Sequence, residues 1–459
     1  MAKLTRKSKS KFGKSPSELG FKIVHQRAAG IDIGSRENWA CIGDEKEHIR
    51  KFGVFTEDHH EMAKWFQSNG VETIAMESTG IYWKSLFLIL QSYGFEVILV
   101  NAGYVKNVPG KKTDIKDCHW IWQLHSVGLL HASFQPDEFT EELRTYNRHR
   151  RTLIQDSSKF VSRMQKALLL MNIHLPTVLS DITGKSGSAI IEHILKGERD
   201  AKTLAALASS RVKASKQTIE KALTGQWHSQ YLFTLKQNWE MYHYYHKQIK
   251  DCDDKIEALL SEKVEQTGKR DLVYEPVKKK QRKKNCPKAK VDLYAYQLTD
   301  GVDLMEIEGF SFTALLTLLA ETGWDLKAKF PTAKNFTSWL SLAPNKRITG
   351  GKVKSSKTNK NKHPLAYAFR QAANSAGNTK DTALGQFFRR IAYKKGRKYA
   401  VTATARKIAT IVYNMITRKE PYRPMGTEDY QEKVREQKIN LIQKSIKDLG
   451  LTQDDLVFA

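Results

Sequence analysis

Hydrophobic and polar residues follow two different periods in the first third of the chain. Residues 27–57 hold three short runs in which apolar and polar side chains roughly alternate, as in strands that bury one face. Beyond them, apolar residues recur every three or four positions in segments that end at Gly70, Gly94 and Gly128, with short apolar runs between. The order is three strands, then helix, strand, helix, strand and helix. It predicts a mixed sheet flanked by helices.

The middle of the chain, from about Glu138 to Glu262, has the periodicity of helices throughout. Its last segment carries a near-heptad apolar seam, which predicts a long amphipathic helix in a helical hairpin or a coiled coil. Two arrangements stay open: this helix packs within its own bundle, or it forms the stalk of a dimer. The seam consists of Leu232, Leu235, Trp239, Tyr242, Tyr245, Ile249, Cys252, Ile256 and Leu259.

A run of basic residues at 276–290 predicts a flexible linker or loop that can contact phosphates. The helical unit after it begins with GFSFTALL, which resembles a helix–turn–helix with Gly309 in the turn. The patterns divide the chain into a disordered basic tail (1–27), an α/β domain (28–137), a helical or coiled-coil domain (138–265), a basic linker (266–298), a mostly helical C-terminal domain (299–421) and a charged helical tail (422–459).

The chain of 459 residues has a formal net charge of +27. A globular protein this basic usually binds a polyanion, and nucleic acid is the commonest one. The four cysteines are far apart and form no CxxC pair, which argues against a zinc ribbon or a disulfide framework and fits a reducing compartment. The sequence shows no bilayer-spanning apolar stretch and no secretory signal. We therefore expect a cytoplasmic protein associated with DNA and not with a membrane.

Four carboxylates stand where strands and helices of the α/β domain are predicted to meet. Asp32 is in the middle of the apolar strand GIDIG, where a buried charge is costly, so a cation is expected beside it. Glu77 ends a later strand, and Asp114 and Asp117 are three residues apart on one face of a helix start. Such side chains can converge at one edge of the sheet. Their oxygen atoms suit Mg²⁺ or Mn²⁺, which would assist phosphoryl displacement.

The chain resembles the DEDD transposases of insertion sequences of the IS110 type. The resemblance rests on GIDIGSRENWA, AMESTGIYW, EVILVNAGYVKNVPGKKTDIKDCHWIWQLHSVGLL and MNIHLPTVLSDITGKSG, and it covers about residues 28–421. It implies an RNase H/RuvC-like fold for the α/β domain, a C-terminal transposase domain, and a bacterial or archaeal source. The family's four acidic positions fall on Asp32, Glu77, Asp114 and Asp117.

The resemblance also implies a chemistry and a set of partners. The C-terminal domain would supply a hydroxyl nucleophile to a composite site with the carboxylates, and the reaction would pass through a covalent protein–DNA intermediate. Donor and target DNA would be the substrates, and a structured RNA encoded by the element would guide them. Homodimers would assemble into tetramers.

The hydroxyl nucleophile has three candidates. Thr349 stands just before Gly-Gly, where the resemblance leads us to expect serine. A threonine hydroxyl can attack, although its methyl group restricts its rotamers. Ser355 and Ser356 follow six and seven residues later. Three alternatives stay open: Thr349 only caps the turn, the serines only bind phosphate, or this copy is inactive.

Basic residues gather near each of these candidate sites, as expected of surfaces that contact nucleic-acid strands. The residues expected to bind nucleic acid are Lys111 and Lys112 before Asp114, Lys346, Arg347, Lys352, Lys354 and Lys357 around Gly-Gly, and Arg389, Arg390, Lys394, Lys395 and Arg397 in an aromatic-containing run.

Three other functions compete with a recombinase. GIDIGS resembles the phosphate loop of sugar kinases and actin-like ATPases, but the later phosphate and adenosine motifs of that class are missing from the sequence. A RuvC-like structure-selective endonuclease, such as a junction resolvase, would share the carboxylates without a covalent intermediate. A non-catalytic nucleic-acid-binding protein would explain the charge and leave the carboxylates unmotivated. A divalent-metal requirement separates the enzymes from the binding protein, and a covalent adduct separates recombinase from resolvase.

Overall fold

A computed structural model describes residues 20–78, 80–101, 114–277, 280–359 and 363–450, and for Asp114, Lys116 and Arg347 it describes the backbone only. The chain forms two compact units, Met1–Gln135 and Pro136–Ala459. In the described part of the chain, no helix is both long and apolar enough to span a membrane.

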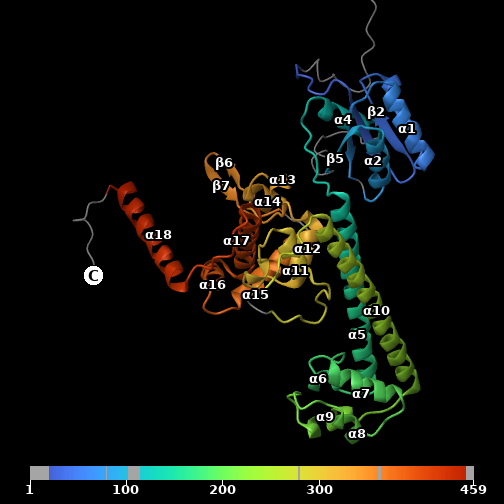
Figure 1. Ribbon diagram of the computed structural model, residues 1–459, viewed down its shortest axis with the longest axis vertical. Coiled ribbons are helices and arrows are strands. Elements are labelled where there is room, and N and C mark those ends of the chain that lie inside the picture. Colours follow the sequence, from blue (N-terminus) through green and yellow to red (C-terminus); the bar gives the residue numbers. More distant parts are fainter. Residues whose placement is uncertain (1–19, 79, 102–113, 278–279, 360–362, 451–459) are drawn as a thin grey trace, which may run out of the picture. The chain divides into compact units, whose positions relative to one another are not determined.

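Within the described residues, the first unit is built on a five-stranded mixed sheet (Figure 1). The strand order is β3-β2-β1-β4-β5, with β1 antiparallel to β2 and parallel to β4. The prediction of a mixed sheet followed by a helical region is confirmed. The elements of this unit are β1 (Ala28–Ile33), β2 (Asn38–Cys41), η1 (Lys46–His48), β3 (Ile49–Phe52), α1 (Thr56–Ser68), β4 (Thr73–Glu77), α2 (Trp83–Ser92), β5 (Glu96–Val100) and α4 (Asp114–Ser126).

The two faces of this sheet carry different helices because side chains alternate along each strand. Ile31, Ile74 and Met76 pack with buried residues of α1 and α2 in the main core of the unit. On the other face, Ala75 packs with Ile121 of α4. Both faces of β1 and β4 are therefore covered, and their continuous apolar sequences follow from this double burial.

A buried histidine joins α4 to the start of β4, and it should make this unit sensitive to acid. Burial, and then the nearby charge of His25, lower the pKa of His125 to about 4 from 6.5. Between pH 6.5 and 4, His125 is protonated in the unfolded chain but stays neutral in the folded one. The free energy of unfolding therefore decreases as the pH drops through this range. The loss is about 3 kcal/mol in full. Calorimetry should show that the stability of His125→Gln depends less steeply on pH than that of wild type. The control variant His131→Gln, at an exposed site, should match wild type. The same pH dependence of stability in all three proteins would refute this prediction.

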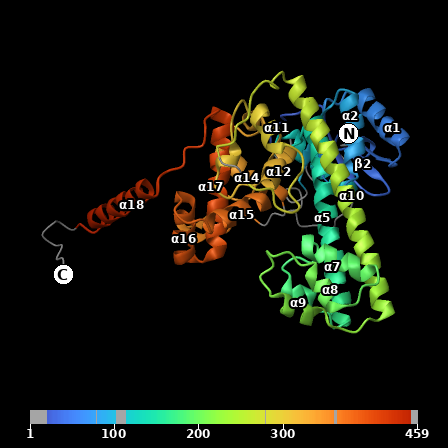
Figure 2. The same ribbon diagram turned by 60° about the horizontal axis from the view of Figure 1, so that its bottom comes forward.

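A long antiparallel pair, α5 (Glu138–Leu170) and α10 (Ser229–Gln266), forms the backbone of the second unit (Figure 2). It carries at one end a cap of four short helices, α6 (Leu175–Val178), α7 (Lys185–Leu195), α8 (Ala201–Ala206) and α9 (Lys216–Leu223). Asp137 starts α5 by accepting a hydrogen bond from the backbone N–H of Thr140. In the middle of the pair, buried Arg150 and Asp253 form an ion pair of 2.7 Å.

The other end of the pair packs into the largest core, which holds buried residues of α10, α11, α12, α15 and α17. Two strands and seven helices lie here in the described residues: α11 (Val291–Leu298), α12 (Phe312–Thr322), α13 (Leu326–Lys329), α14 (Ala333–Trp339), β6 (Arg347–Thr349), β7 (Lys352–Ser355), α15 (Pro364–Gly377), α16 (Ala383–Lys395) and α17 (Arg397–Arg418), besides the single turn η2 (Leu304–Glu306). Helix α18 (Thr427–Asp448) follows and contacts α16.

The basic segment predicted as a linker at 266–298 differs from that expectation. Its last part is α11, whose Val291 and Leu298 are buried in the core. Lys280 donates to the carbonyl oxygens of Ile307 and Phe310 at 2.9 and 2.8 Å. Part of the basic run thus binds the backbone of the segment before α12, through Lys280.

Gly309, predicted in the turn of a helix–turn–helix, lies in a half-buried turn before α12. Its φ is +78°, and a Cβ there would lie 2.2 Å from the carbonyl oxygen of Ala372 in α15. The glycine therefore serves the close packing of the turn before α12 against α15.

Candidate active site

Gly30, in the middle of β1, lets α4 cross the sheet at backbone distance. A Cβ at Gly30 would lie 2.3 Å from the backbone nitrogen of Trp122 and 2.6 Å from the carbonyl oxygen of Cys118. Any side chain here would push α4 away from the sheet. Because residues two apart in a strand share a face, the side chain of Asp32 lies on the α4 side of β1.

The direction of α4 follows from its two ends. Near its C-terminus, Nε2 of His125 lies 3.0 Å from Oγ1 of Thr73, the first residue of β4. The N-terminal turn of α4 must then lie toward the carboxyl ends of β4 and of β1, which is parallel to it. That turn begins at Asp114 and contains Asp117.

Strand register brings Glu77 beside Asp32. Ile31 pairs with Met76 across the parallel strands β1 and β4, so the next residues, Asp32 and Glu77, are neighbours on one face. Glu77 is buried and Asp32 is half-buried, and both interact with other residues of the chain. The carboxyl edge of these two strands thus gathers the positions of all four predicted acidic residues.

Two cysteine thiols lie beneath this edge. A hydrogen bond with Cys41 and burial raise the pKa of the Cys118 thiol, and the negative charge of Asp32 raises it further. Each thiol also donates to a backbone carbonyl, that of Gly43 and that of Ile115. The Cys118 thiol therefore stays protonated, and the donors that this edge offers to a cation are carboxylate oxygens.

The donor chemistry of this edge fits a hard divalent cation. Among the side chains that the structure describes, no three of His, Cys, Asp and Glu are gathered into a preformed metal cluster. Asp114 is outside that comparison because only its backbone is described. The neighbouring Lys111 and Lys112, predicted to meet phosphate, lie outside the described residues.

The Thr349 candidate stands at the turn of the β6–β7 hairpin. Thr349 pairs with Lys352, and between them Gly350 and Gly351 have φ values of +55° and +72°. Two positive φ angles in a two-residue turn define the type I′ geometry that Gly-Gly favours. Thr349 is exposed, so its hydroxyl can be reached from solvent.

The two serine candidates have different surroundings. Ser355 ends β7 and accepts a hydrogen bond from the backbone N–H of Lys357 at 3.3 Å, which gives it a structural role. Ser356 is exposed and lines a cavity between helices α16, α17 and α18. The basic residues Lys346, Lys352, Lys354 and Lys357 are exposed around the hairpin.

The predicted basic run in α16 and α17 divides into two groups. Arg389 donates to the carbonyl oxygen of Thr379, and Arg397 donates to the side chain of Asn374 at 2.6 Å, so these two arginines bind their own chain. Arg390, Lys394 and Lys395 instead line the same cavity as Ser356.

Sequence reasoning missed a buried ionic cluster around Glu321, whose side chain is fully buried in α12. Arg148 of α5 donates to both of its oxygens, at 2.9 and 2.8 Å, and Arg144 lies 3.4 Å away. His363, which caps α15 just after the hairpin segment, approaches the same carboxylate at 3.7 Å. Arg148 and Glu321 are 173 residues apart in the sequence. The one local signal of the cluster was therefore a glutamate within the apolar run of α12.

Two family models match this chain. Residues 29–173, which include the carboxylate edge, match the DEDD transposase model of the IS110 type, described as a transposase. Residues 303–388, which include the hairpin, match the model described as the transposase IS116/IS110/IS902 family. A comparison with curated proteins gives no match. The two matched regions together make up about half of the chain and fall on its two candidate sites. This chain belongs to the IS116/IS110/IS902 family of transposases.

Proposed function

We propose that this transposase cuts and rejoins DNA with two sets of groups, the carboxylates of the sheet edge and a hydroxyl of the β6–β7 hairpin. Membership of an insertion-sequence transposase family makes donor and target DNA the substrates. The single observation that carries the proposal is the placement of Asp32, Glu77 and the start of α4 at one edge of the sheet. Its strand order and parallel β1–β4–β5 part also suit an RNase H/RuvC-like fold.

Asp32, Glu77, Asp114 and Asp117 would hold Mg²⁺ or Mn²⁺. Such an ion would polarise the scissile phosphate and stabilise the departing oxygen. Thr349 Oγ1 attacks the phosphorus, a bond from phosphorus to this oxygen forms, and the bond from phosphorus to a DNA oxygen breaks. The proton lost by the threonine hydroxyl balances the proton that the departing DNA oxygen gains. Attack by the hydroxyl of another DNA end then frees Thr349 and closes the new junction. The exposed position of Thr349 favours it over Ser355, whose oxygen is engaged within the turn.

The remaining parts of the proposal concern assembly and guidance. The net charge of +27 exceeds what one duplex requires and suits a structured guide RNA in addition to donor and target DNA. On the α5–α10 pair, exposed Phe233, Met241 and Tyr244 provide an apolar side on which two chains would form a coiled-coil dimer that joins into tetramers.

Trapping the covalent adduct tests the hydroxyl. Cells carrying donor and target plasmids would express wild type, Thr349→Ala, Thr349→Ser, Ser355→Ala or Ser356→Ala. Protein-linked DNA is isolated under denaturing conditions, and junctions are counted by PCR. We expect adduct and junctions from every chain except Thr349→Ala, because serine keeps the attacking oxygen.

The other outcomes are equally informative. Loss in Ser356→Ala alone would move the attack to Ser356. Junctions or nicks without any adduct would support the resolvase-like endonuclease instead. Normal adduct from all four variants would place the nucleophile outside this hairpin and overturn that part of the proposal.

A further inference from the structure

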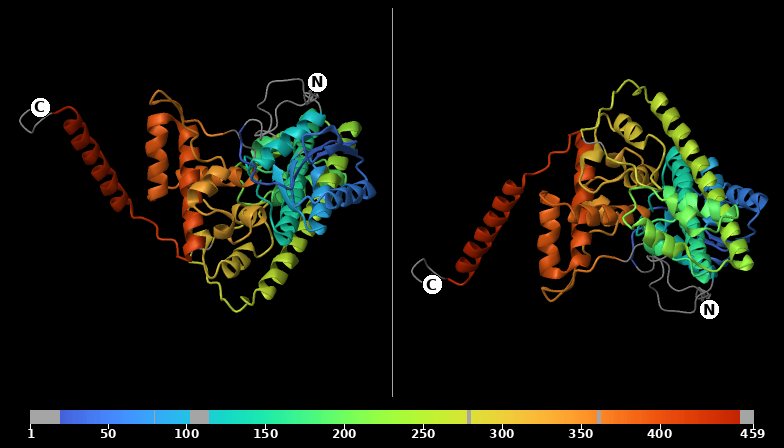
Figure 3. Two further views of the ribbon diagram at one scale, coloured as in Figure 1. Left: turned by 90° about the horizontal axis from the view of Figure 1, so that it is seen from above. Right: turned by 90° about the horizontal axis from the view of Figure 1, so that it is seen from below.

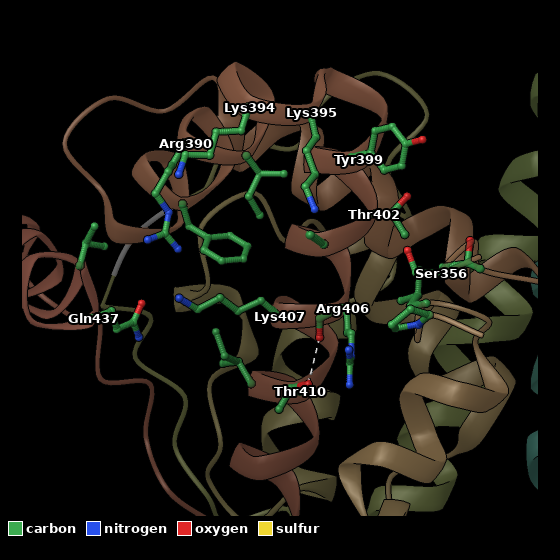
Figure 4. Close-up of a pocket in the computed structure, with 18 of the residues that line it drawn as sticks. Ser356, Arg390, Lys394, Lys395, Tyr399, Thr402, Arg406, Lys407, Thr410 and Gln437 are labelled. Carbon is green, nitrogen blue, oxygen red and sulfur yellow. Dashed lines mark hydrogen bonds between the residues drawn. The ribbon is translucent and has the colours of Figure 1, made fainter. Parts of the chain in front are cut away.

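A cavity of about 1030 Å³ lies between α16, α17, α18 and the segment after β7 (Figure 4). Figure 3 shows α16 and α17 side by side in both of its views, and α18 contacts α16. We call this cavity the cationic cleft, because six basic side chains line it and none of its lining residues is acidic. The six are Arg390, Lys394, Lys395, Arg406, Lys407 and Lys438.

These cations have not been neutralised within the protein. Over the described residues, none of the six forms an ion pair with a carboxylate, whereas most other buried or half-buried arginines named above do. Arg390 and Lys407 both lie over the faces of the Phe387 and Tyr430 rings. Burial and the charges of Lys433 and Arg390 lower the pKa of Lys407. Like charges held this close favour an anionic occupant.

Four apolar residues that line the cleft are buried or half-buried, and we call them its apolar floor: Leu342, Phe387, Ile391 and Ile411. Tyr399 of α17 and Leu441 of α18 also line the cleft, and both are exposed. A ring of cations over an apolar floor matches a molecule that carries both phosphates and flat apolar faces. Unpaired nucleotides have both, whereas a duplex presents mainly phosphates because its base faces are stacked inside.

The size and position of the cleft agree with this occupant. Its volume is at the upper end of the range for sites that hold single ligands, so it has room for a few nucleotides and not for a double helix. The hydroxyl of Ser356 opens into it, only seven residues after Thr349 (Figure 4). A strand bound here would run next to the β6–β7 hairpin that carries Thr349, which we call the hydroxyl hairpin.

We propose that the cationic cleft binds a short unpaired stretch of nucleic acid, with phosphates on the cations and a base against Tyr399 and the apolar floor. This inference rests on the proposed recombinase function, which must separate strands before exchanging them. It assigns strand binding to Arg406, Lys407 and Lys438, three cations that the sequence patterns did not single out.

Fluorescence anisotropy of the full chain with a labelled 20-nucleotide oligo-dT tests the charges, without divalent metal. The cleft variant Lys394→Gln/Lys395→Gln/Arg406→Gln should weaken binding, and the slope of log K against log salt should become shallower by about 2. The matched control, Lys236→Gln/Lys247→Gln/Lys255→Gln, removes the same charge from exposed sites on α10 and should bind like wild type. Unchanged melting temperatures would show that all chains are folded.

An abasic oligonucleotide of equal length tests the base contact. Tyr399→Ala should weaken oligo-dT binding about 5- to 150-fold and leave abasic binding unchanged, while Tyr399→Phe should keep wild-type affinity for both. If the cleft variant binds oligo-dT as tightly as the α10 control, the cleft is not a strand site and this proposal is overturned. Equal effects of Tyr399→Ala on both probes would overturn the base contact.

The same binding assay distinguishes failure of the cleft proposal from failure of the proposed function. Asp32→Asn should bind oligo-dT like wild type, since the carboxylates are not part of the cleft. Wild type without any salt-dependent binding would contradict both proposals, whereas binding that survives in the cleft variant contradicts only the cleft.

Discussion

Asp32→Asn is expected to reduce the yield of recombination junctions at least about a thousandfold. Asparagine keeps the shape of the side chain and removes the charge that holds a divalent cation. Such a cation contributes several kcal/mol to a phosphoryl transition state, and about 4 kcal/mol corresponds to a factor of a thousand. Junctions would be counted by quantitative PCR from cells that carry donor and target plasmids.

Strand β4 offers a matched pair of carboxylates for the control. Glu77 lies at its carboxyl end beside Asp32, whereas Glu72 precedes its first residue and pairs with exposed Arg27. Glu77→Gln should lose activity as Asp32→Asn does, and Glu72→Gln should keep it. Purified wild type should also lose cleavage in EDTA and regain it with Mg²⁺ or Mn²⁺. Junction yields of Asp32→Asn within about threefold of wild type would refute the metal site.

The carboxylate edge could be predicted because its information is local. Asp32 interrupts an apolar strand, Glu77 ends one, and Asp117 lies in the first turn of a helix, so each position follows from short-range periodicity. The edge at which they meet follows from the general rule for parallel strands. Gly30 could not be interpreted in this way, since the need for glycine comes from α4, some ninety residues later.

The C-terminal site was harder to predict from sequence. Gly-Gly indicated a turn, and the structure adds the two short strands around it, whose exposed Ile348 and Val353 pair across the hairpin. The cationic cleft is lined by residues of α16, α17 and α18. These residues meet through tertiary packing, which the periodicity of the sequence does not reveal. The basic run across α16 and α17 was predicted as one nucleic-acid-binding group. The structure divides this group, because Arg389 and Arg397 bind their own chain while other residues of the run line the cleft.

The Glu321 cluster has the same long-range origin, and it joins α5 to α12 close to the start of α15. Glu321 on α12 receives two hydrogen bonds from Arg148 of α5 and faces His363, which begins α15 after the hairpin. Burial lowers the pKa of His363 to about 4, although the charge of Glu321 opposes this effect. The histidine is therefore neutral at pH 7, and the two arginines neutralise the buried carboxylate.

Glu321→Ala should destabilise the second unit by about 3–5 kcal/mol, because it leaves Arg144 and Arg148 without their buried counter-charge. For a unit of this size, the calorimetric midpoint should fall by roughly 5–10 °C. The control, Glu265→Ala, breaks an exposed ion pair with Arg270 and should cost at most about 1 kcal/mol. A midpoint of Glu321→Ala no lower than that of Glu265→Ala would show that the cluster does not hold this unit together. A lowered midpoint with fewer junctions at temperatures where the variant is still folded would show that the anchor also positions the hydroxyl hairpin.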